Sequence, residues 1–333
     1  MITATTTDFP WDDLEIPRRR GEFVTKLISA DVNPNRHRVF WARSWRGKPA
    51  LLLEYGASTW VKMTLPSPSG ITVRDAPETG TLTIELEEVG KEASELFLEV
   101  CNDIVGTLQE HPIEESRQAC ILRLRRWSEL LRPERKRLSL ERQKGLIAEL
   151  AFLRDDMFAT RGPGAALEGW VGPEGGKRDF AFGQVLAEVK SKRDSAHHEV
   201  KVSSEDQLST NPSERLFLCV VEVNPAPDGP EDCHEDTFTL KDAVEGAKGE
   251  LTSPLQRETL EVKLALAGYF DEDDYSDCRW SRGSVSYYEV RDGFPRLRPE
   301  DLAPGVSGVK YRLDLSYCAD FLVNRDVVIE AMG

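Results

Sequence analysis

The segment DFAFGQVLAEVKSKRD, residues 179–194, most constrains the fold because it sets three charged side chains in an apolar run of β-forming residues. Gly183-Gln184 suits a two-residue hairpin turn in which glycine takes the unusual first position. In that register Phe182 pairs with Val185, and the face that carries these two side chains is apolar along the whole hairpin. We therefore expect two antiparallel strands with one face packed against a core.

The other face of this hairpin carries the charges. The same register sets Asp179 opposite Glu188, with Cβ atoms about 5 Å apart, and Lys190 lies on the same face. Paired carboxylates repel each other, whereas Mg²⁺, which is commonly held by one or two carboxylates, would make the arrangement favourable. A solvated face on which Lys190 offsets the two acids is the alternative. The apolar Ala181 and Leu186 beside the acids favour a strand inside a sheet, and so favour the metal site.

The rest of the chain shows a β-rich beginning and then helical periodicity. The expected strands are residues 37–45, 49–56, two within 70–88, 215–223, 283–290 and 309–318. The expected helices are residues 93–111, 113–132, 139–158 with Ser139 as the cap, 240–251 and 254–268. We expect an N-terminal β-rich region with its helix at 1–110, a core at 111–225 and a C-terminal α/β extension at 226–333.

The charge pattern resembles the PD-(D/E)XK signature of the restriction-endonuclease-like nucleases, read as Asp179 followed by Glu188-Val189-Lys190. GLIAEL (145–150) resembles the helix before the core hairpin, and HHEVKVSSEDQL (197–208) resembles the segment that opens the next helix. LFLCVVEV (216–223) then supplies a strand. The resemblance implies an α/β fold with the core order α-β-β-β-α-β.

A narrower resemblance covers most of residues 140–320 and adds the run 169–180, SSEDQL and the terminal FPRL and VKYRLDLS. It points to a bacterial PD-(D/E)XK family that was formerly classed as a domain of unknown function and occurs among phage-defence and restriction genes. The first aspartate follows Arg178 rather than proline, which is a common variation in the superfamily.

The resemblance implies a role for each motif residue. Asp179 and Glu188 would bind Mg²⁺, for which Mn²⁺ is expected to substitute, together with the Val189 carbonyl, and Lys190 would activate water. Glu149 would bind through a water or help to hold a second metal, or it is a solvated helix residue. The remaining expected site residues are Gln207 at the site edge, with a helix-capping role as the alternative, and the phosphate-contacting Lys192, Arg193, His197, His198 and Lys201.

Charge and composition limit the functional classes. The net charge of −15 weighs against broad affinity for polyanions, although ten basic residues lie between Arg117 and Lys144 against three glutamates. This cluster predicts either a nucleic-acid-binding face or a solvated basic helix. No apolar run is long enough to span a bilayer, the N-terminus lacks an apolar signal region, and the six cysteines form no CxxC pair, so we expect a cytoplasmic protein. Cys233-His234 could ligate a metal, but an incidental loop pair is the more common case.

Together these features predict a Mg²⁺-dependent DNA endonuclease of a bacterial restriction or phage-defence system. Because the rest of the chain is acidic, we expect partner proteins, such as an ATPase, to deliver it to DNA. A homodimer is compatible with the resemblance. A nuclease-fold subunit that binds DNA or protein without cutting is the alternative. A metal-dependent hydrolase of RNA or nucleotides is a third, weaker interpretation.

Overall fold

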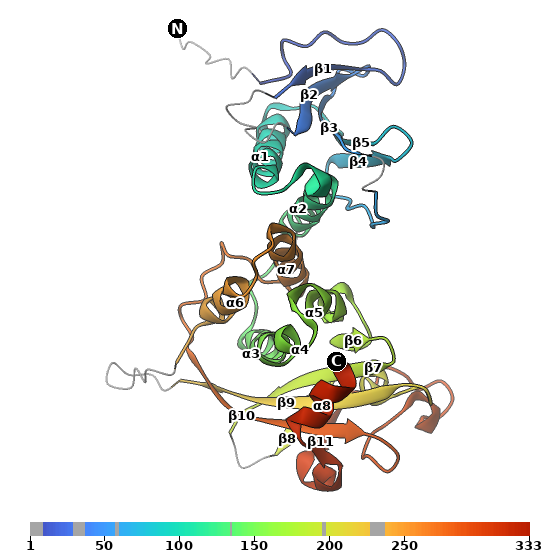
Figure 1. Cartoon of the computed structure of the whole chain (residues 1–333), viewed down its shortest axis with the longest axis vertical. Coiled ribbons are helices and arrows are strands. Elements are labelled where there is room, and N and C mark those ends of the chain that lie inside the picture. Colours follow the sequence, from blue (N-terminus) through green and yellow to red (C-terminus); the bar gives the residue numbers. More distant parts are fainter. Residues whose placement is uncertain (1–8, 29–36, 57–59, 134, 195–197, 227–236) are drawn as a thin grey trace. The chain divides into compact units, whose positions relative to one another are not determined.

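The structure, a computed structural model, describes residues 9–28, 37–56, 60–133, 135–194, 198–226 and 237–333. The chain forms two compact units (Figure 1). The first unit consists of Met1–Arg135 and Ser253–Ala265, and the second of Lys136–Thr252 and Leu266–Gly333. The chain therefore returns to the first unit for one helix before it completes the second.

The first unit contains a five-stranded antiparallel sheet with the order β1-β2-β3-β5-β4. Its strands are β1 (Phe23–Leu27), β2 (Arg38–Ser44), β3 (Pro49–Glu54), β4 (Ile71–Ala76) and β5 (Thr81–Leu86). The two hairpins predicted from the sequence are confirmed, whereas β1 is not among the predicted strands. The turn between β2 and β3 contains Gly47, whose φ of +73° favours glycine.

Two helices share the apolar core of this sheet, α1 (Lys91–Leu108) and α2 (Ser116–Leu130). The 3₁₀ turn η2 (Ile113–Glu115) and the part of α7 (Pro254–Ala267) up to Ala265 complete the first unit. Phe97 and Ile104 on α1 are fully buried in one cluster with Leu51 and Leu82 of the sheet. Burial of each such side chain contributes about 1.5–3 kcal/mol, so α1 is held chiefly by this apolar face.

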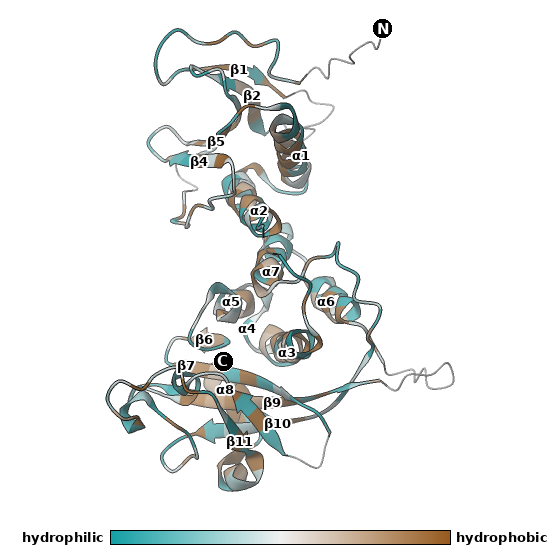
Figure 2. Cartoon of the chain, turned by 180° about the vertical axis from the view of Figure 1, so that it is seen from behind, coloured by the Kyte–Doolittle hydropathy of each residue, from teal (hydrophilic) through white to brown (hydrophobic). Residues whose placement is uncertain are grey.

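The second unit contains a five-stranded mixed sheet with the order β12-β10-β9-β7-β6 and a two-stranded sheet, β11-β8. The strands are β6 (Phe180–Phe182), β7 (Val185–Lys192), β8 (Glu199–Val202), β9 (Arg215–Pro225), β10 (Trp280–Val290), β11 (Tyr311–Asp314) and β12 (Leu322–Val323). β7 and β9 are parallel, and the other pairs are antiparallel. The central β9 is an apolar run buried on both faces, and Figure 2 shows its hydrophobic colouring.

Two helices of the second unit, at residues 140 and 240, begin where the sequence predicts, whereas those that begin at Pro163 and Arg325 were not predicted. The helices of this unit are α3 (Leu140–Ala151), continued by a π-helical segment η3 (Phe152–Phe158) and α4 (Ala159–Arg161), then α5 (Pro163–Gly169), α6 (Leu240–Gly249) and α8 (Arg325–Met332). The Ser139 side chain accepts a hydrogen bond from the Arg142 amide and caps α3, as expected. Figure 1 shows α3, α4 and α5 on one side of the five-stranded sheet and β8 and β11 on the other.

The predicted hairpin is confirmed in its register. Phe182 pairs with Val185 and Phe180 with Ala187 across a turn in which Gly183 has a φ of +65°. β6 begins at Phe180, so Asp179 precedes the strand instead of forming its first pair. The helix expected after the motif is only a 3₁₀ turn, η5 (Glu205–Leu208), because Ser204 and Ser209 on either side are extended.

The units differ from the expected division of the chain. Residues 111–135 pack with α1 in the first unit, because α2 shares its apolar core. In the C-terminal region β10 and β12 are strands of the five-stranded sheet, and residues 253–265 belong to the first unit. The region after residue 226 therefore completes both units.

The mixture of helices with several sheets confirms the predicted α/β class. Within the described ranges, none of the helices combines the length and the apolar composition needed to cross a bilayer.

Candidate active site

Asp179 is fixed by its backbone as well as by its side chain. Its carbonyl accepts hydrogen bonds from the amides of Val171 and Gly172 at 2.9 and 3.0 Å. A Cβ atom on Gly172 would lie 3.0 Å from the Asp179 Oδ1 atom and 3.1 Å from its Cα, so a larger residue here would displace the aspartate. The Asp179 Oδ2 atom accepts the Val189 amide at 2.7 Å, which directs the carboxylate toward β7.

Glu188 and Lys190 project from one face of β7 into the same site. Glu188 is 1% exposed, and its Oε1 atom accepts a hydrogen bond from the Lys190 Nζ atom at 2.6 Å. Lys190 also donates to the Oε1 atom of Gln207 at 3.1 Å, and that oxygen accepts the Ser203 amide at 2.7 Å. The lysine is thus held between a strand carboxylate and an amide oxygen from η5.

Glu149 reaches the site from α3. Its Oε2 atom accepts a hydrogen bond from the indole nitrogen of Trp170 at 2.8 Å. Trp170 is fully buried and stacks on Phe180, the first residue of β6. This contact fixes the glutamate at the side of the hairpin on which Asp179 lies.

The site has an excess of negative charge in a buried environment. Burial and the neighbouring Asp179 raise the pKa of Glu188 to about 8, and the same two causes raise the pKa of Glu149 to about 8. Burial also raises the pKa of Asp179, although the Lys190 ammonium opposes this. Burial acts to lower the pKa of Lys190, but the charges of Glu188 and Asp179 outweigh it and raise that pKa above its ordinary value. One ammonium therefore faces three carboxyl groups.

One oxygen of this site suits a metal ion. The Oε2 atom of Glu188 is buried and has no hydrogen-bond partner in the described part of the chain. Leaving a buried acceptor unpaired is costly, and a bound cation would remove that cost. Among the described residues no three His, Cys, Asp or Glu side chains are grouped closely enough to form a metal cage. The donors of Asp179 and Glu188 instead fit Mg²⁺, which takes one or two carboxylates and keeps several waters.

The structure brings together the residues of the predicted motif. Asp179 and Glu188 approach one face of the hairpin with Lys190, and Gln207 contacts the lysine directly. Glu149 is coupled to Asp179 and Glu188 through their charges. Their catalytic and metal-binding roles, with that of the Val189 carbonyl, stay predictions.

The residues expected to contact phosphate are more scattered. Lys192 forms an ion pair with Glu222 at 2.8 Å, in which both side chains are largely buried, and Arg193 pairs loosely with Glu141 at 3.6 Å. Lys201 is exposed on β8. His198 is also exposed, and its carbonyl accepts the amide of Leu315. His197 and the Cys233-His234 pair lie outside the described residues.

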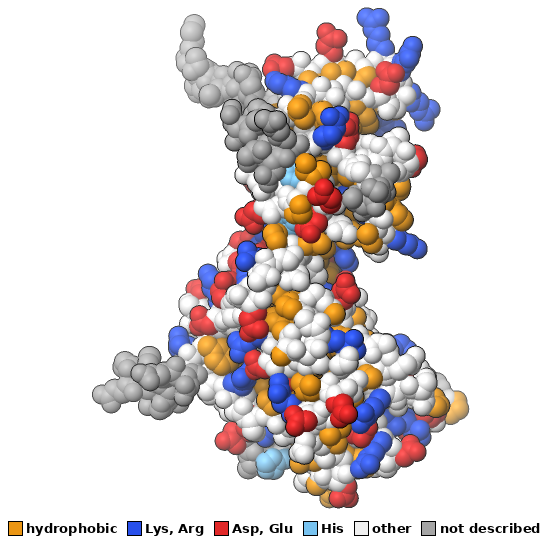
Figure 3. Space-filling view, in the orientation of Figure 1, with side chains coloured by type: hydrophobic (Ala, Val, Ile, Leu, Met, Phe, Trp, Pro, Cys, Tyr) orange, Lys and Arg blue, Asp and Glu red, His pale blue; other side chains and the backbone are white. Residues whose placement is uncertain are grey.

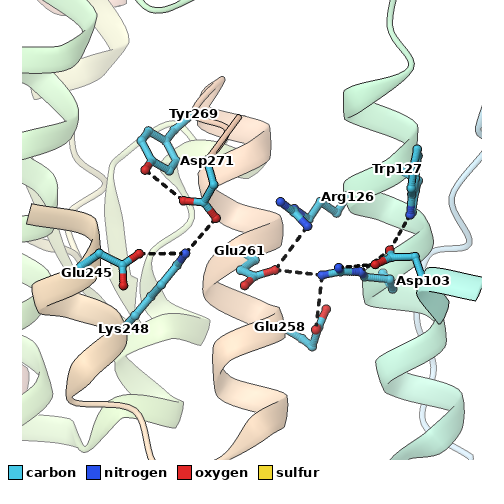
Figure 4. Close-up of polar contacts among 10 residues, drawn as sticks. Asp103, Arg126, Trp127, Glu245, Lys248, Glu258, Glu261, Tyr269 and Asp271 are labelled. Carbon is cyan, nitrogen blue, oxygen red and sulfur yellow. Dashed lines mark hydrogen bonds and ion pairs between the residues drawn. The ribbon is translucent and has the colours of Figure 1, made fainter. Parts of the chain in front are cut away.

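Most basic residues of the 117–144 cluster form ion pairs with acidic side chains. Arg117 is 1% exposed and contacts Asp75 at 2.5 Å. Arg123 contacts Asp103 at 2.6 Å and Glu261 at 3.0 Å, and Figure 4 shows the neighbouring Arg126 in contact with the same Glu261. Both interpretations of the cluster are therefore wrong for Arg117 and Arg123, because a buried cation requires a paired anion.

Sequence reasoning missed three residues that shape the site. Trp170 holds Glu149, Gly172 admits Asp179, and Arg178 is 7% exposed beside them. Trp170 and Gly172 lie in the Gly-Trp and Gly-Pro pairs of residues 169–173. These pairs contributed to the family resemblance of the run 169–180, but they did not indicate which residues it contacts. The sequence singled out Arg178 only because it stands before Asp179 at the position where the superfamily signature has proline.

The fold and the site together define a nuclease-like protein of the PD-(D/E)XK, restriction-endonuclease-like class. Residues 7–316 match the family described as "Putative PD-(D/E)XK family member, (DUF4420)", and the chain belongs to this family. The predicted resemblance is thereby confirmed. No curated protein and no solved structure gives a match to the chain.

Proposed function

We propose that the protein is a Mg²⁺-dependent endonuclease that hydrolyses phosphodiester bonds in DNA as a cytoplasmic component of a bacterial restriction or phage-defence system. The observation that carries this proposal is the buried Glu188 Oε2 atom, which has no partner among the described residues and lies in a site with Asp179 and Lys190. A carboxylate in that state needs a cation to be stable when it is ionised.

The residues of the site would have separate roles in metal binding and in the activation of water. Asp179 and Glu188 would hold Mg²⁺ with the Val189 carbonyl, while Glu149 stands next to Asp179 for a second metal or a metal-bound water. When bound, the cation supplies Lewis acidity and lowers the pKa of its water. Lys190 keeps its hydrogen bond to Gln207, so its ammonium stays in place to orient the attacking water and to stabilise negative charge on the phosphate.

The negative net charge of the chain suggests that it needs partner proteins to bind DNA. A net charge of −15 opposes unaided binding to DNA, and Figure 3 shows basic and acidic side chains interspersed over the visible face of the second unit. Delivery by partner proteins of the same defence system, such as an ATPase, would overcome this repulsion. A homodimer would allow both strands of a duplex to be cut.

Nuclease assays with Mg²⁺ or Mn²⁺ on supercoiled, linear and single-stranded DNA test the proposal. Cleavage is expected with either metal, and Glu188→Ala or Lys190→Ala should abolish it. Cleavage that survives either substitution would overturn the assigned mechanism. No cleavage with any metal, together with tight binding to DNA or to a partner, would favour the scaffold function instead.

A further inference from the structure

A cavity of about 230 Å³ lies beside the proposed catalytic groups in the second unit. Three segments form it: the loop before β6, the β6–β7 hairpin and the loop that follows η5. We call it the Arg178 cavity, and its lining residues used below are Lys177, Arg178, Ala181, Leu186, Asp206 and Glu214. It is smaller than the pockets that hold drug-sized ligands, so it fits a single small ring system.

Each wall of the Arg178 cavity is adjacent in sequence to a group of the active site. Arg178 precedes Asp179, and Asp206 precedes Gln207. Leu186 lies two residues before Glu188 on the same face of β7, which places it about 7 Å away along the strand. A substrate whose phosphate lies at the carboxylates would therefore bring its neighbouring group to this cavity.

The lining combines charges of both signs with apolar surface. Lys177 and Arg178 are balanced by Asp206 and Glu214, while Ala181 and Leu186 provide an apolar wall. A phosphate would meet two carboxylates as well as two cations here, so the lining offers it no net charge attraction. A nucleobase suits the lining better, because its edge offers both hydrogen-bond donors and acceptors and its face is apolar.

One hydrogen-bond donor of Arg178, in the wall of this cavity, has no partner among the residues that the structure describes. Its terminal nitrogens donate to the carbonyls of Lys177 and Ser209, but its buried Nε atom has no acceptor within the described ranges. A buried donor without a partner is unfavourable, so a ligand acceptor that reached the Nε atom would be stabilised. Arginine and lysine are the side chains that most often contact guanine O6 and N7 in DNA, so a guanidinium N–H is a suitable donor to a base edge.

We propose that the Arg178 cavity binds one unpaired nucleobase next to the scissile phosphate, and that the substrate is single-stranded or locally unpaired DNA. This inference rests on the proposed nuclease function and names its substrate class. A base that is stacked and paired in a duplex cannot enter a cavity, whereas a bulged or single-stranded base enters at little cost.

Binding assays test the inference without cleavage. The full chain is titrated, with EDTA present, against a fluorescein-labelled duplex, the same duplex with one bulged nucleotide, and the bulged duplex with an abasic residue. The duplex with the bulged base should bind about tenfold tighter than the other two, which corresponds to one good base contact. Guanine, adenine, cytosine and thymine at the bulge should differ in affinity.

Variants connect the binding preference to the cavity. Thr210 also lines the cavity. Ala181→Leu and, independently, Thr210→Leu fill the space and should remove the advantage of the bulged base. Asp206→Asn should change the ranking of the four bases, which a merely structural role would not do. Gln184→Ala, at the exposed hairpin turn outside the cavity, is the matched control and should keep the preference.

The outcomes separate this inference from the proposed function. Equal binding of bulged, abasic and matched duplexes, or a preference that survives both filling variants, overturns the cavity assignment even if the protein cleaves DNA. A base preference that the filling variants abolish supports the assignment even if no metal yields cleavage, and the nuclease function alone would then fail.

Discussion

Two buried charged clusters of the molecule differ in how far their carboxylate charge is compensated. In the first unit Arg123 contacts Asp103, Glu258 and Glu261, and each of these anions lies within 3.6 Å of it. In the second unit the ammonium of Lys190 and the charge of Arg178 act on the carboxyl groups of the active site. One buried oxygen of Glu188, like one of Glu258 in the first unit, has no hydrogen-bond partner among the described residues.

The difference is clearest at Asp103, because burial raises the pKa of Glu258 in the same network to about 7. Hydrogen bonds from Arg123 keep the pKa of Asp103 below its ordinary value although burial acts to raise it, so this carboxylate is stable as an anion. In the active site burial prevails and raises the pKa of Glu188 to about 8. Uncompensated buried charge is costly, which makes it a sign of a bound partner rather than of stability.

The largest expected effect is on catalysis. Glu188→Gln should lower the rate of DNA cleavage by about 10³-fold or more, because it removes a metal ligand while keeping the shape of the side chain. Urea unfolding should show a free energy equal to or above that of the wild type, since the substitution removes an uncompensated charge. A variant that retains cleavage, or that loses its fold, would contradict the comparison.

Arg123→Met should affect stability instead. It leaves Asp103 and Glu258 without their common cation, so we expect the first unit to lose about 3–5 kcal/mol of unfolding free energy. Arg132→Met is the control, because its contact with Glu129 is exposed on the arginine side and should contribute at most about 1 kcal/mol. Equal effects of the two substitutions in urea titrations would show that the network is not structural.

Metal binding should stabilise only the active-site cluster. At a hundredfold excess over its dissociation constant, Mg²⁺ or Mn²⁺ should stabilise the protein by about 2.7 kcal/mol, seen as a higher melting temperature. Asp179→Asn should lose this shift, whereas Arg123→Met should keep it. A shift of equal size in both variants would place the metal elsewhere.

The pH dependence without metal gives a smaller effect of defined sign. Glu149 and Glu188 have folded-state pKa values of about 8, raised from ordinary values of 4.5, so the folded state binds more protons than the unfolded state between these limits. Their contribution to stability is therefore greatest below about pH 4.5 and falls as the pH rises toward about 8. In EDTA, Glu149→Gln should reduce this fall, as measured by urea unfolding at several pH values.

Asp103 of the Arg123 network should respond in the opposite direction, whereas Glu258, whose pKa burial raises to about 7, should follow the trend of Glu188. Because the pKa of Asp103 is lowered, its stabilising contribution is present above the ordinary value of 3.8 and is lost as the pH falls through the folded-state pKa. Asp103→Asn should thus cost stability at neutral pH and progressively less in acid. A constant cost over this range would argue against ion pairing as its cause.

The smallest effect separates two lysines that were both expected to reach phosphate. Lys201 is exposed, so Lys201→Ala should weaken binding to DNA and reduce the salt slope by about one. Lys192 is paired with Glu222, so Lys192→Ala should leave that slope nearly unchanged and affect stability instead. Fluorescence anisotropy over a range of NaCl concentrations distinguishes them.

The sequence alone determined the hairpin, because a two-residue turn and strict alternation are local properties. Once Gly183-Gln184 is the turn, Glu188 and Lys190 must share a face, and the structure confirms that register. Asp179 was predicted to pair with Glu188 across the two strands, but it precedes β6, and its side chain instead accepts a hydrogen bond from the Val189 amide of β7.

Tertiary structure decided which charges are compensated. Arg123 meets Glu261, 138 residues further along the chain, and Trp170 meets Glu149 across 21 residues, so no local pattern contains either contact. Arg117 and Arg123 looked free for nucleic acid because the anions that they contact lie elsewhere in the sequence. Residue order sets the periodicity of strands and helices, but the energy of a buried charge depends on distances that only the folded chain defines.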